Sequence, residues 1–323
     1  MLSTKFENIL EKYEKQKFNT YRVVEILGDD YTFTDFGSDT TDKRYRALVE
    51  CGTQLHFQKN MEQGSYVYHL VGANFCRQRL CPMCQFRNAE RMYAKMIKVI
   101  KHLESGYRFI HLVLTIPNSR DGSELIDGIK VLYKAYNMLM HRKKVIKAFK
   151  GSLRCLEISY NYDNDTFHPH LHCLIAVKPS YFNDSRVYMS RDEIAELWTS
   201  CVNKSVKSFK FTEYIKTDTV YQTFVRACKP GDYEGVAEVC KYCLKPLDLH
   251  DKGKDEQHKR VLLTLWHTLK GQRFVQKYGV IKDTFKLLFG DDDEDDEELE
   301  ELDNSNKLFL LWNSEIQKYC EGV

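Results

Sequence analysis

The sequence predicts an α+β fold built on one antiparallel sheet. The first strand is indicated by Arg108–Ile116, an apolar stretch rich in β-branched residues that stops at Pro117. Two more apolar stretches, Leu153–Tyr160 and His168–Val177, are joined by the polar residues Asn161–Asp165, which favour a tight turn. These two stretches therefore predict an antiparallel hairpin.

Helices are predicted before and after this hairpin. Apolar residues recur at helical spacing over Ser123–Phe149. Ser190 and Glu193 have the spacing of a capping box and begin a second helix. Thr219–Ala227 then has the composition of a strand, and Asp232–Leu244 that of a last helix. The order β-α-β-β-α-β is that of the ferredoxin-like (RRM-like) arrangement, and we expect the first and third strands to be central and the helices to cover one face.

The chain is expected to divide into four consecutive parts. Residues 1–50 have no assigned role, and residues 51–104 form a small zinc-binding, cysteine-rich segment that continues into a basic helix. Residues 105–246 form the sheet domain, and residues 247–323 a helical C-terminal region. Its acidic segment, 291–303, holds eleven carboxylates, which leaves 35 acidic against 48 basic side chains elsewhere. The body of the protein is therefore basic, which suits a partner that carries phosphates, and the acidic segment is typical of solvated chain.

Composition argues against a membrane protein or a secreted one. No apolar stretch approaches the length of a membrane-spanning helix, and the polar first residues do not resemble a secretory signal. We therefore expect a soluble cytoplasmic protein. In a reducing cytosol its eleven cysteines are more often metal ligands or buried thiols than disulfides.

Three histidines alternate with other residues at the start of the third strand, in the sequence FHPHLHCLIAV. Because side chains alternate between the faces of a strand, His168, His170 and His172 are expected to project the same way. His170 and His172 could hold one divalent cation. The neighbouring strand offers Glu157 as a third ligand, since it is the only acidic residue there and a carboxylate is rarely buried without a partner. Two imidazoles and a carboxylate suit Mn²⁺ or Mg²⁺ near a scissile phosphate.

Four cysteines upstream of the sheet have the spacing of zinc ligands. They are Cys51, Cys76, Cys81 and Cys84. Four thiolates around Zn²⁺ would stabilise a segment too small to fold alone, in a structural role. His56 and His69 are alternatives to Cys51 as the fourth ligand, and the competing interpretation is a set of buried free thiols.

The helix that follows these cysteines has a basic side. Its candidate DNA-binding residues are Arg87, Arg91, Lys95 and Lys98. Such a stripe suits a phosphate backbone, although a solvated helix face has the same pattern.

Glu238, Tyr242 and Lys245 are spaced by four and three residues on the last predicted helix, which places them on one helical face. A tyrosyl oxygen can act as a covalent nucleophile when a metal and an ammonium group offset its charge. The chain has twenty tyrosines, so the meaning of Tyr242 depends on the histidine strand. The sequence Cys240-Lys-Tyr-Cys243 within this helix is interpreted as packing and not as a metal site.

Taken together, FIHLVLT, HPHLH and E-x-x-x-Y-x-x-K resemble the rolling-circle replication initiators of small plasmids from Gram-positive bacteria, which are HUH endonucleases. The upstream stretch FCRQRLCPMC also resembles that family, so that the resemblance covers residues 51–246. It implies a bacterial cytoplasmic enzyme with an HUH sheet domain. Its partners would be plasmid origin DNA, single-stranded or in a hairpin, and the host helicase and DNA polymerase.

The resemblance also implies roles for single residues. His170 and His172 would be the metal-binding pair, with Glu157 as third ligand. Tyr242 would nick one strand, hold its 5′ end as a phosphotyrosine and leave a free 3′-OH. Glu238 would activate water to end the cycle.

Two other functions fit the same residues. A mobilisation relaxase or a single-strand transposase of the HUH type would share the histidines and the tyrosine. A non-catalytic zinc-containing nucleic-acid-binding protein could use the same kind of sheet, but it would present exposed aromatic residues on the central strands.

Overall fold

The computed structural model describes residues 4–28, 38–62, 64–209, 215, 221, 223–231, 233–240, 249–290 and 307–322. Contacts divide the chain into two compact units. The first unit consists of Met1–Arg87, Asp248–Leu263 and Asp293–Val323, and the second of Asn88–Leu247 and Thr264–Asp292. Each unit thus combines stretches that are far apart in the sequence, so the division by packing differs from the four consecutive parts expected above.

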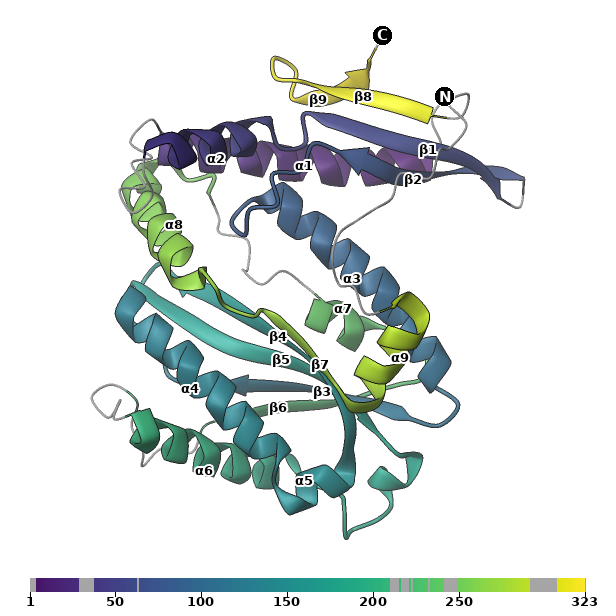
Figure 1. The fold of residues 1–323 in the computed structure, drawn as a ribbon, viewed down its shortest axis with the longest axis vertical. Coiled ribbons are helices and arrows are strands. Elements are labelled where there is room, and N and C mark those ends of the chain that lie inside the picture. Colours follow the sequence, from purple (N-terminus) through teal and green to yellow (C-terminus); the bar gives the residue numbers. More distant parts are fainter. Residues whose placement is uncertain are drawn as a thin grey trace. The chain divides into compact units, whose positions relative to one another are not determined.

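The first unit contains a four-stranded antiparallel sheet with the strand order β2-β1-β8-β9 (Figure 1). Its elements are α1 (Thr4–Leu27), α2 (Ser38–Glu50), β1 (Gln54–Glu62), β2 (Ser65–Ala73), β8 (Lys307–Asn313) and β9 (Lys318–Glu321). Aromatic contacts join α1 to this sheet, because the ring of Phe6 stacks on Tyr68 and meets Phe57 edge to face. Phe6 and Phe57 are both buried, so these ring contacts belong to the core of the unit.

The expectation of a helical C-terminal region is wrong for the last part of the chain. Residues 255–289 do contain α8 (Asp255–Leu269) and α9 (Gly279–Phe289). The last described residues are strands, however, and Leu310 of β8 pairs with Leu55 of β1. A short strand whose partner lies more than 200 residues away carries no local signal of its pairing, which is why sequence periodicity missed it.

The second unit contains a five-stranded antiparallel sheet with the order β6-β3-β5-β4-β7. Its elements are the greater part of α3 (Pro82–Leu103), β3 (Arg108–Thr115), α4 (Gly122–Met140), α5 (Lys143–Ala148), β4 (Phe149–Asn161), β5 (Thr166–Val177), the short 3-10 helix η1 (Pro179–Phe182), α6 (Arg191–Phe209), β6 (Thr223–Cys228), α7 (Glu234–Cys240), β7 (Val275–Tyr278) and α9. The first and third predicted strands, β3 and β5, are the central ones. The central placement of these two strands agrees with the expectation from the sequence, and β7 is an additional edge strand.

The predicted hairpin between β4 and β5 is confirmed together with its turn. The side-chain oxygen of Asn161 accepts hydrogen bonds from the backbone N–H groups of Asp163 and Asn164, at 2.9 and 3.0 Å. Asp165 has a positive φ of 50°, a conformation that Asn and Asp tolerate better than most residues. The turn fixes the register in which Glu157 faces His170 across the two strands.

Helices cover both faces of this sheet, which corrects the expectation of a single covered face. On one side α4 lies over β4, where Tyr136 hydrogen-bonds Ser152 and Tyr133 stacks on Arg154. On the other side α3, α7 and α9 pack on alternate residues of the same strands, including Leu153 and Leu174 (Figure 1). Both faces of the central strands carry buried apolar residues, such as Leu112 on one and Leu174 on the other, so helices pack on both. None of the described helices is long and apolar enough to cross a membrane.

A close backbone approach allows β7 to join the sheet. A side chain at Gly151 of β4 would begin only 2.9 Å from the carbonyl oxygen of Tyr278 and from the backbone nitrogen of Ile281. Glycine is therefore needed where the β7–α9 junction crosses β4. This junction places α9 over the same face as α3 and α7.

Candidate functional sites

Three metal-ligating side chains meet on the face of the sheet that carries α7. Strand register places Glu157 of β4 directly opposite His170 of β5. One carboxylate oxygen of Glu157 lies 2.9 Å from Nε2 of His172 and 3.7 Å from Nε2 of His170. We call Glu157, His170 and His172 the metal triad. The structure thus brings together the three residues that the sequence proposed for one cation.

The geometry and charge of the metal triad fit a divalent cation. One ligand atom from each residue can be chosen so that all three lie within 4.8 Å of one another. Two ligand atoms, each about 2.1 Å from a shared ion, are separated by about 3 to 4 Å. Burial alone would raise the pKa of the Glu157 carboxyl, but hydrogen bonds from His170 and His172 outweigh it and hold the pKa well below its usual range. The carboxylate is therefore charged and available as a ligand.

Another histidine, His111, contacts one ligand of the metal triad on the ring edge that faces away from Glu157. Nε2 of His111, on β3, lies 3.1 Å from Nδ1 of His172, and the two rings are nearly parallel. His111 is buried, so this contact is shielded from water. Because the contact engages Nδ1 of His172, it leaves Nε2 of that ring directed at Glu157 and at a cation. The sequence interpretation had not assigned a role to His111.

The rim of the site is fixed by Asn118, just after β3. Its side-chain oxygen lies 2.7 Å from Nδ1 of His168, and its amide nitrogen donates to the hydroxyl of Thr166. Burial, and to a lesser degree the neighbouring His170, lowers the pKa of His168 to about 4. His168 is thus neutral at pH 7 and held beside the triad by a hydrogen bond.

The helix that was expected to carry the nucleophile packs on the same face as the triad. Val236, Val239 and Cys240 of α7 belong to one buried cluster with Cys155 and Leu174. Cys155 is the register partner of His172, and Leu174 follows His172 by two residues, so both share its face. The described part of α7 therefore covers the histidine face of the sheet.

Two of the three expected catalytic residues lie outside the described residues. These are Tyr242 and Lys245. Glu238 is described, as a half-buried residue of α7. Their assignment stays a prediction from the sequence, supported here by the face on which α7 packs.

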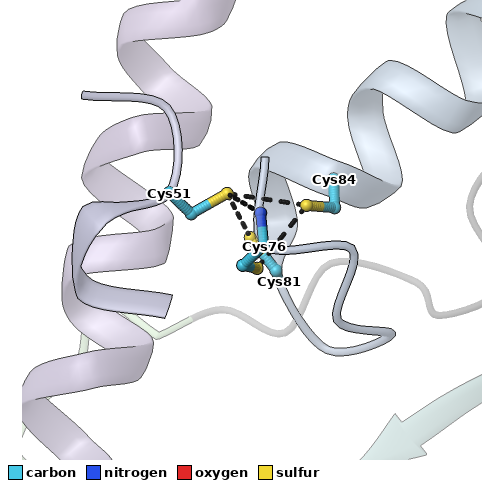
Figure 2. Close-up of side chains that lie close together, drawn as sticks. All are labelled: Cys51, Cys76, Cys81 and Cys84. Atoms are coloured by element: carbon cyan, nitrogen blue, oxygen red, sulfur yellow. Dashed lines mark hydrogen bonds between the residues drawn. The ribbon is translucent and has the colours of Figure 1, made fainter. Parts of the chain in front are cut away.

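The four expected zinc ligands also come together, in the first unit (Figure 2). The sulfur of Cys51 lies 3.4 Å from that of Cys81 and 3.5 Å from that of Cys84, and the sulfur of Cys76 lies 3.6 Å from that of Cys84. Zn–S bonds of about 2.3 Å in a tetrahedron place the sulfurs about 3.8 Å apart, so the four thiols fit Zn²⁺ closely. We call these residues the cysteine cluster.

A buried lysine lies beside the cysteine cluster. Nζ of Lys17, on α1, donates to the carbonyl oxygens of Cys51 at 2.8 Å and of Val49 at 3.0 Å. Burial lowers the pKa of Lys17, and the negative charge of nearby Cys51 and Cys81 opposes that effect. Four thiolates around Zn²⁺ carry a net charge of −2, which an ammonium group at this position partly neutralises. The hydrogen bonds of Lys17 thus hold the first helix beside the cysteine cluster.

The basic side of α3 is partly engaged inside the protein. Arg87 donates to the carbonyl oxygen of Leu70, and the ammonium of Lys95 lies 5.7 Å from the ring centre of Phe285. Lys98 is exposed. A role of these residues and of Arg91 in binding DNA stays a prediction.

An α+β protein that brings together a histidine–carboxylate triad on β4 and β5 and a four-cysteine cluster is, by its fold and sites, a candidate metal-binding protein. Comparisons with known proteins give the family. Residues 67–320 match the family Rep_1, described as replication protein, and the chain belongs to this family.

Curated relatives extend over most of the chain. The chain is 30% identical to Protein rep of Streptococcus pneumoniae over 288 residues, and this match covers 83% of the chain and 81% of the relative. Protein rep of Lactiplantibacillus plantarum is 27% identical over 322 residues, 96% of this chain and 97% of the relative. Protein rep of Staphylococcus aureus is 41% identical over 157 residues, 47% of this chain and 66% of the relative. No solved structure matches the chain. The resemblance to replication proteins of Gram-positive bacteria is thereby confirmed.

Proposed function

We propose that this replication protein initiates rolling-circle replication of a plasmid by nicking one strand of the origin. The observation that carries the proposal is the metal triad, on the neighbouring strands β4 and β5 and on the face that α7 covers. The expected nucleophile Tyr242 follows Cys240, the last described residue of α7, by two positions.

The reaction is a transesterification at phosphorus. A divalent ion, Mn²⁺ or Mg²⁺, held by Glu157, His170 and His172 would polarise a phosphate oxygen of the scissile bond. Tyr242 attacks the phosphorus, so that a bond from its phenolic oxygen to the 5′ phosphate forms as the bond to the 3′ oxygen breaks. The phenolic proton is transferred to the departing strand, which ends in a free 3′-OH. Lys245 would offset the charge on the phenolate.

Termination requires the phosphotyrosine to be released. Glu238 precedes Tyr242 by four residues, the spacing of one helical turn. We assign to Glu238 the role of general base that activates water against the Tyr242 phosphotyrosine. Release by hydrolysis leaves the enzyme free of DNA and needs no second tyrosine.

The cysteine cluster has a separate, structural role in this proposal. Its four sulfurs would hold Zn²⁺, with Lys17 beside them. The cluster belongs to the first unit and the metal triad to the second. Zinc would therefore stabilise the unit that helps to dock origin DNA, without a part in the chemistry.

The test uses single-stranded origin oligonucleotide labelled at its 3′ end, incubated with the protein and Mn²⁺. Wild type should form a covalent adduct that survives denaturing electrophoresis, and Tyr242→Phe should form none. Tyr233→Phe, at a tyrosine just before α7, is the matched control and should react like wild type. Glu238→Ala should nick but accumulate adduct. An adduct that survives Tyr242→Phe would refute the assignment.

Two rival functions give different results in the same assay. A relaxase or transposase of the HUH type would also form the adduct, but Glu238→Ala would not change its release. A non-catalytic zinc-containing nucleic-acid-binding protein would form no adduct. The metal triad on β4 and β5, in place of the stacking aromatics that such a binder would present on its central strands, favours the nicking enzyme.

A further inference from the structure

An exposed aromatic side chain lies on the same face of the sheet as the metal triad. Phe224, on β6, has 49% of its surface exposed. A single exposed apolar side chain is ordinary on a protein surface, so its exposure alone carries no meaning. Its significance comes from the position of Phe224 in the sheet.

Strand register places Phe224 in one row with a metal ligand. Phe224 is paired with Val113 of β3, and Val113 is paired with His172 of β5. Residues directly opposite each other on neighbouring strands project to the same face. Two strand spacings separate β6 from β5, so the row spans about 10 Å from Phe224 to His172.

A ring contact confirms that the side chain points to this face. The Phe224 ring meets the His111 ring edge to face, with centres 5.7 Å apart, and His111 contacts Nδ1 of His172. Phe224 therefore has one side supported by a buried histidine and the other open to solvent. Among the described strands β6 is an edge of the sheet, so no further strand covers this position.

The charge around Phe224 favours an uncharged aromatic ligand over a phosphate. The nearest cation on its strand and face, Arg226, lies 3.2 Å from the carboxylate of Glu234, which offsets its charge. An exposed phenyl ring binds the flat face of a nucleobase by stacking, and this binding tolerates any base sequence. We propose that Phe224 is a stacking platform for one base of the single strand, close to the scissile phosphodiester.

This inference rests on the proposed nicking function and adds a base-binding position to it. With one base held about 10 Å from the triad, the strand enters the site in a fixed register. The platform thus positions the phosphodiester, whereas the metal triad would hold the ion that polarises it and Tyr242 would attack it.

The test measures binding without chemistry. Full-length protein is titrated into fluorescein-labelled oligo-dT in buffer without Mn²⁺, Mg²⁺ or a chelator, so that nicking is suppressed while zinc in the cysteine cluster is retained, and the anisotropy is followed. Phe224→Ala and Phe224→Leu should each bind about 5- to 100-fold more weakly, because each variant loses the binding free energy of stacking one base on an aromatic ring. Phe224→Trp should bind like wild type. Phe224→Leu keeps an apolar side chain against His111, so it separates stacking from support of that histidine.

The matched control is Phe182, an exposed phenylalanine at the end of η1 with 40% of its surface exposed and a ring contact to Tyr181. Phe182→Ala should leave oligo-dT affinity unchanged. Photo-crosslinking of an iododeoxyuridine oligonucleotide should label the peptide that contains Phe224. Affinity within twofold of wild type for both Phe224→Ala and Phe224→Leu would overturn the inference and would leave that ring as a contact for another protein.

The adduct assay separates this inference from the proposed function. If wild type forms the Tyr242 adduct while the Phe224 variants bind oligo-dT normally, the platform is refuted and the nicking function stands. If the variants lose affinity but wild type forms no adduct, the platform stands as a DNA-binding position and the nicking function fails.

Discussion

Nε2 of His111 lies 3.1 Å from Nδ1 of His172, and the two ring planes differ by only 17°. This contact joins β3 to the metal triad on β5. It uses the ring nitrogen of His172 that is not directed at Glu157, so it determines which nitrogen faces a cation.

His111→Leu should weaken Mn²⁺ binding by about 10- to 100-fold, the usual cost of losing a partner behind a metal-bound histidine. His111→Gln can still hydrogen-bond Nδ1 and should recover part of the affinity. Isothermal titration with Mn²⁺ gives both values, and the exposed His102→Gln serves as the control. Wild-type affinity in His111→Leu would show that His172 needs no such partner.

Glu157→Gln should lose Mn²⁺ binding and nicking while keeping its affinity for single-stranded DNA. The glutamine amide has nearly the shape of the glutamate carboxylate, but it lacks the negative charge that contacts His170 and His172 in wild type. The control is Glu193→Gln, at a carboxylate that pairs with Lys144 at the surface. Nicking at the wild-type rate in Glu157→Gln would exclude this residue as a ligand.

The cysteine cluster predicts one tightly bound zinc ion for each chain. Elemental analysis should find it in wild type and in Cys320→Ser, an exposed cysteine outside the cluster, but not in Cys81→Ser. Removal of zinc with a chelator should lower the unfolding temperature. Lys17→Met should lower zinc affinity, because it removes the ammonium that offsets the thiolate charge. Full zinc content in Cys81→Ser would contradict a four-cysteine site.

The pH dependence of stability in metal-free protein should contain a contribution from His168. Its pKa of about 4 in the folded protein lies below the reference value of 6.5. The unfolded chain therefore binds a proton more readily, and this part of the stability is present above pH 6.5 and is lost as pH falls towards 4. Denaturant unfolding at several pH values should show a smaller acid loss in His168→Gln. An identical pH profile in the variant would disprove the lowered pKa.

The sequence could predict those features that depend on local periodicity. The alternation of His168, His170 and His172 placed them on one face, and the turn before β5 set the register that brings Glu157 to them. The spacing from Cys76 to Cys84 indicated the candidate metal-binding segment for the same reason. In each case the residues that define the feature are close together in the chain.

Other features depended on contacts between distant segments. A single histidine in the apolar strand β3 gave no sign that His111 would meet His172, and nothing near Lys17 indicated that it would reach the carbonyl of Cys51. The pairing of β8 with β1 joins segments more than 200 residues apart. The basic stripe of α3 was drawn from helical spacing alone, which cannot show that Lys95 lies near the ring of Phe285.

The most direct test of the account is mass spectrometry of the protein after reaction with single-stranded origin DNA and Mn²⁺. Nuclease and protease digestion should leave one peptide, containing Tyr242, whose mass is increased by a 5′-linked nucleotide. A nucleotide on any other tyrosine, or no nucleotide on a protein that nicks its origin, would contradict it.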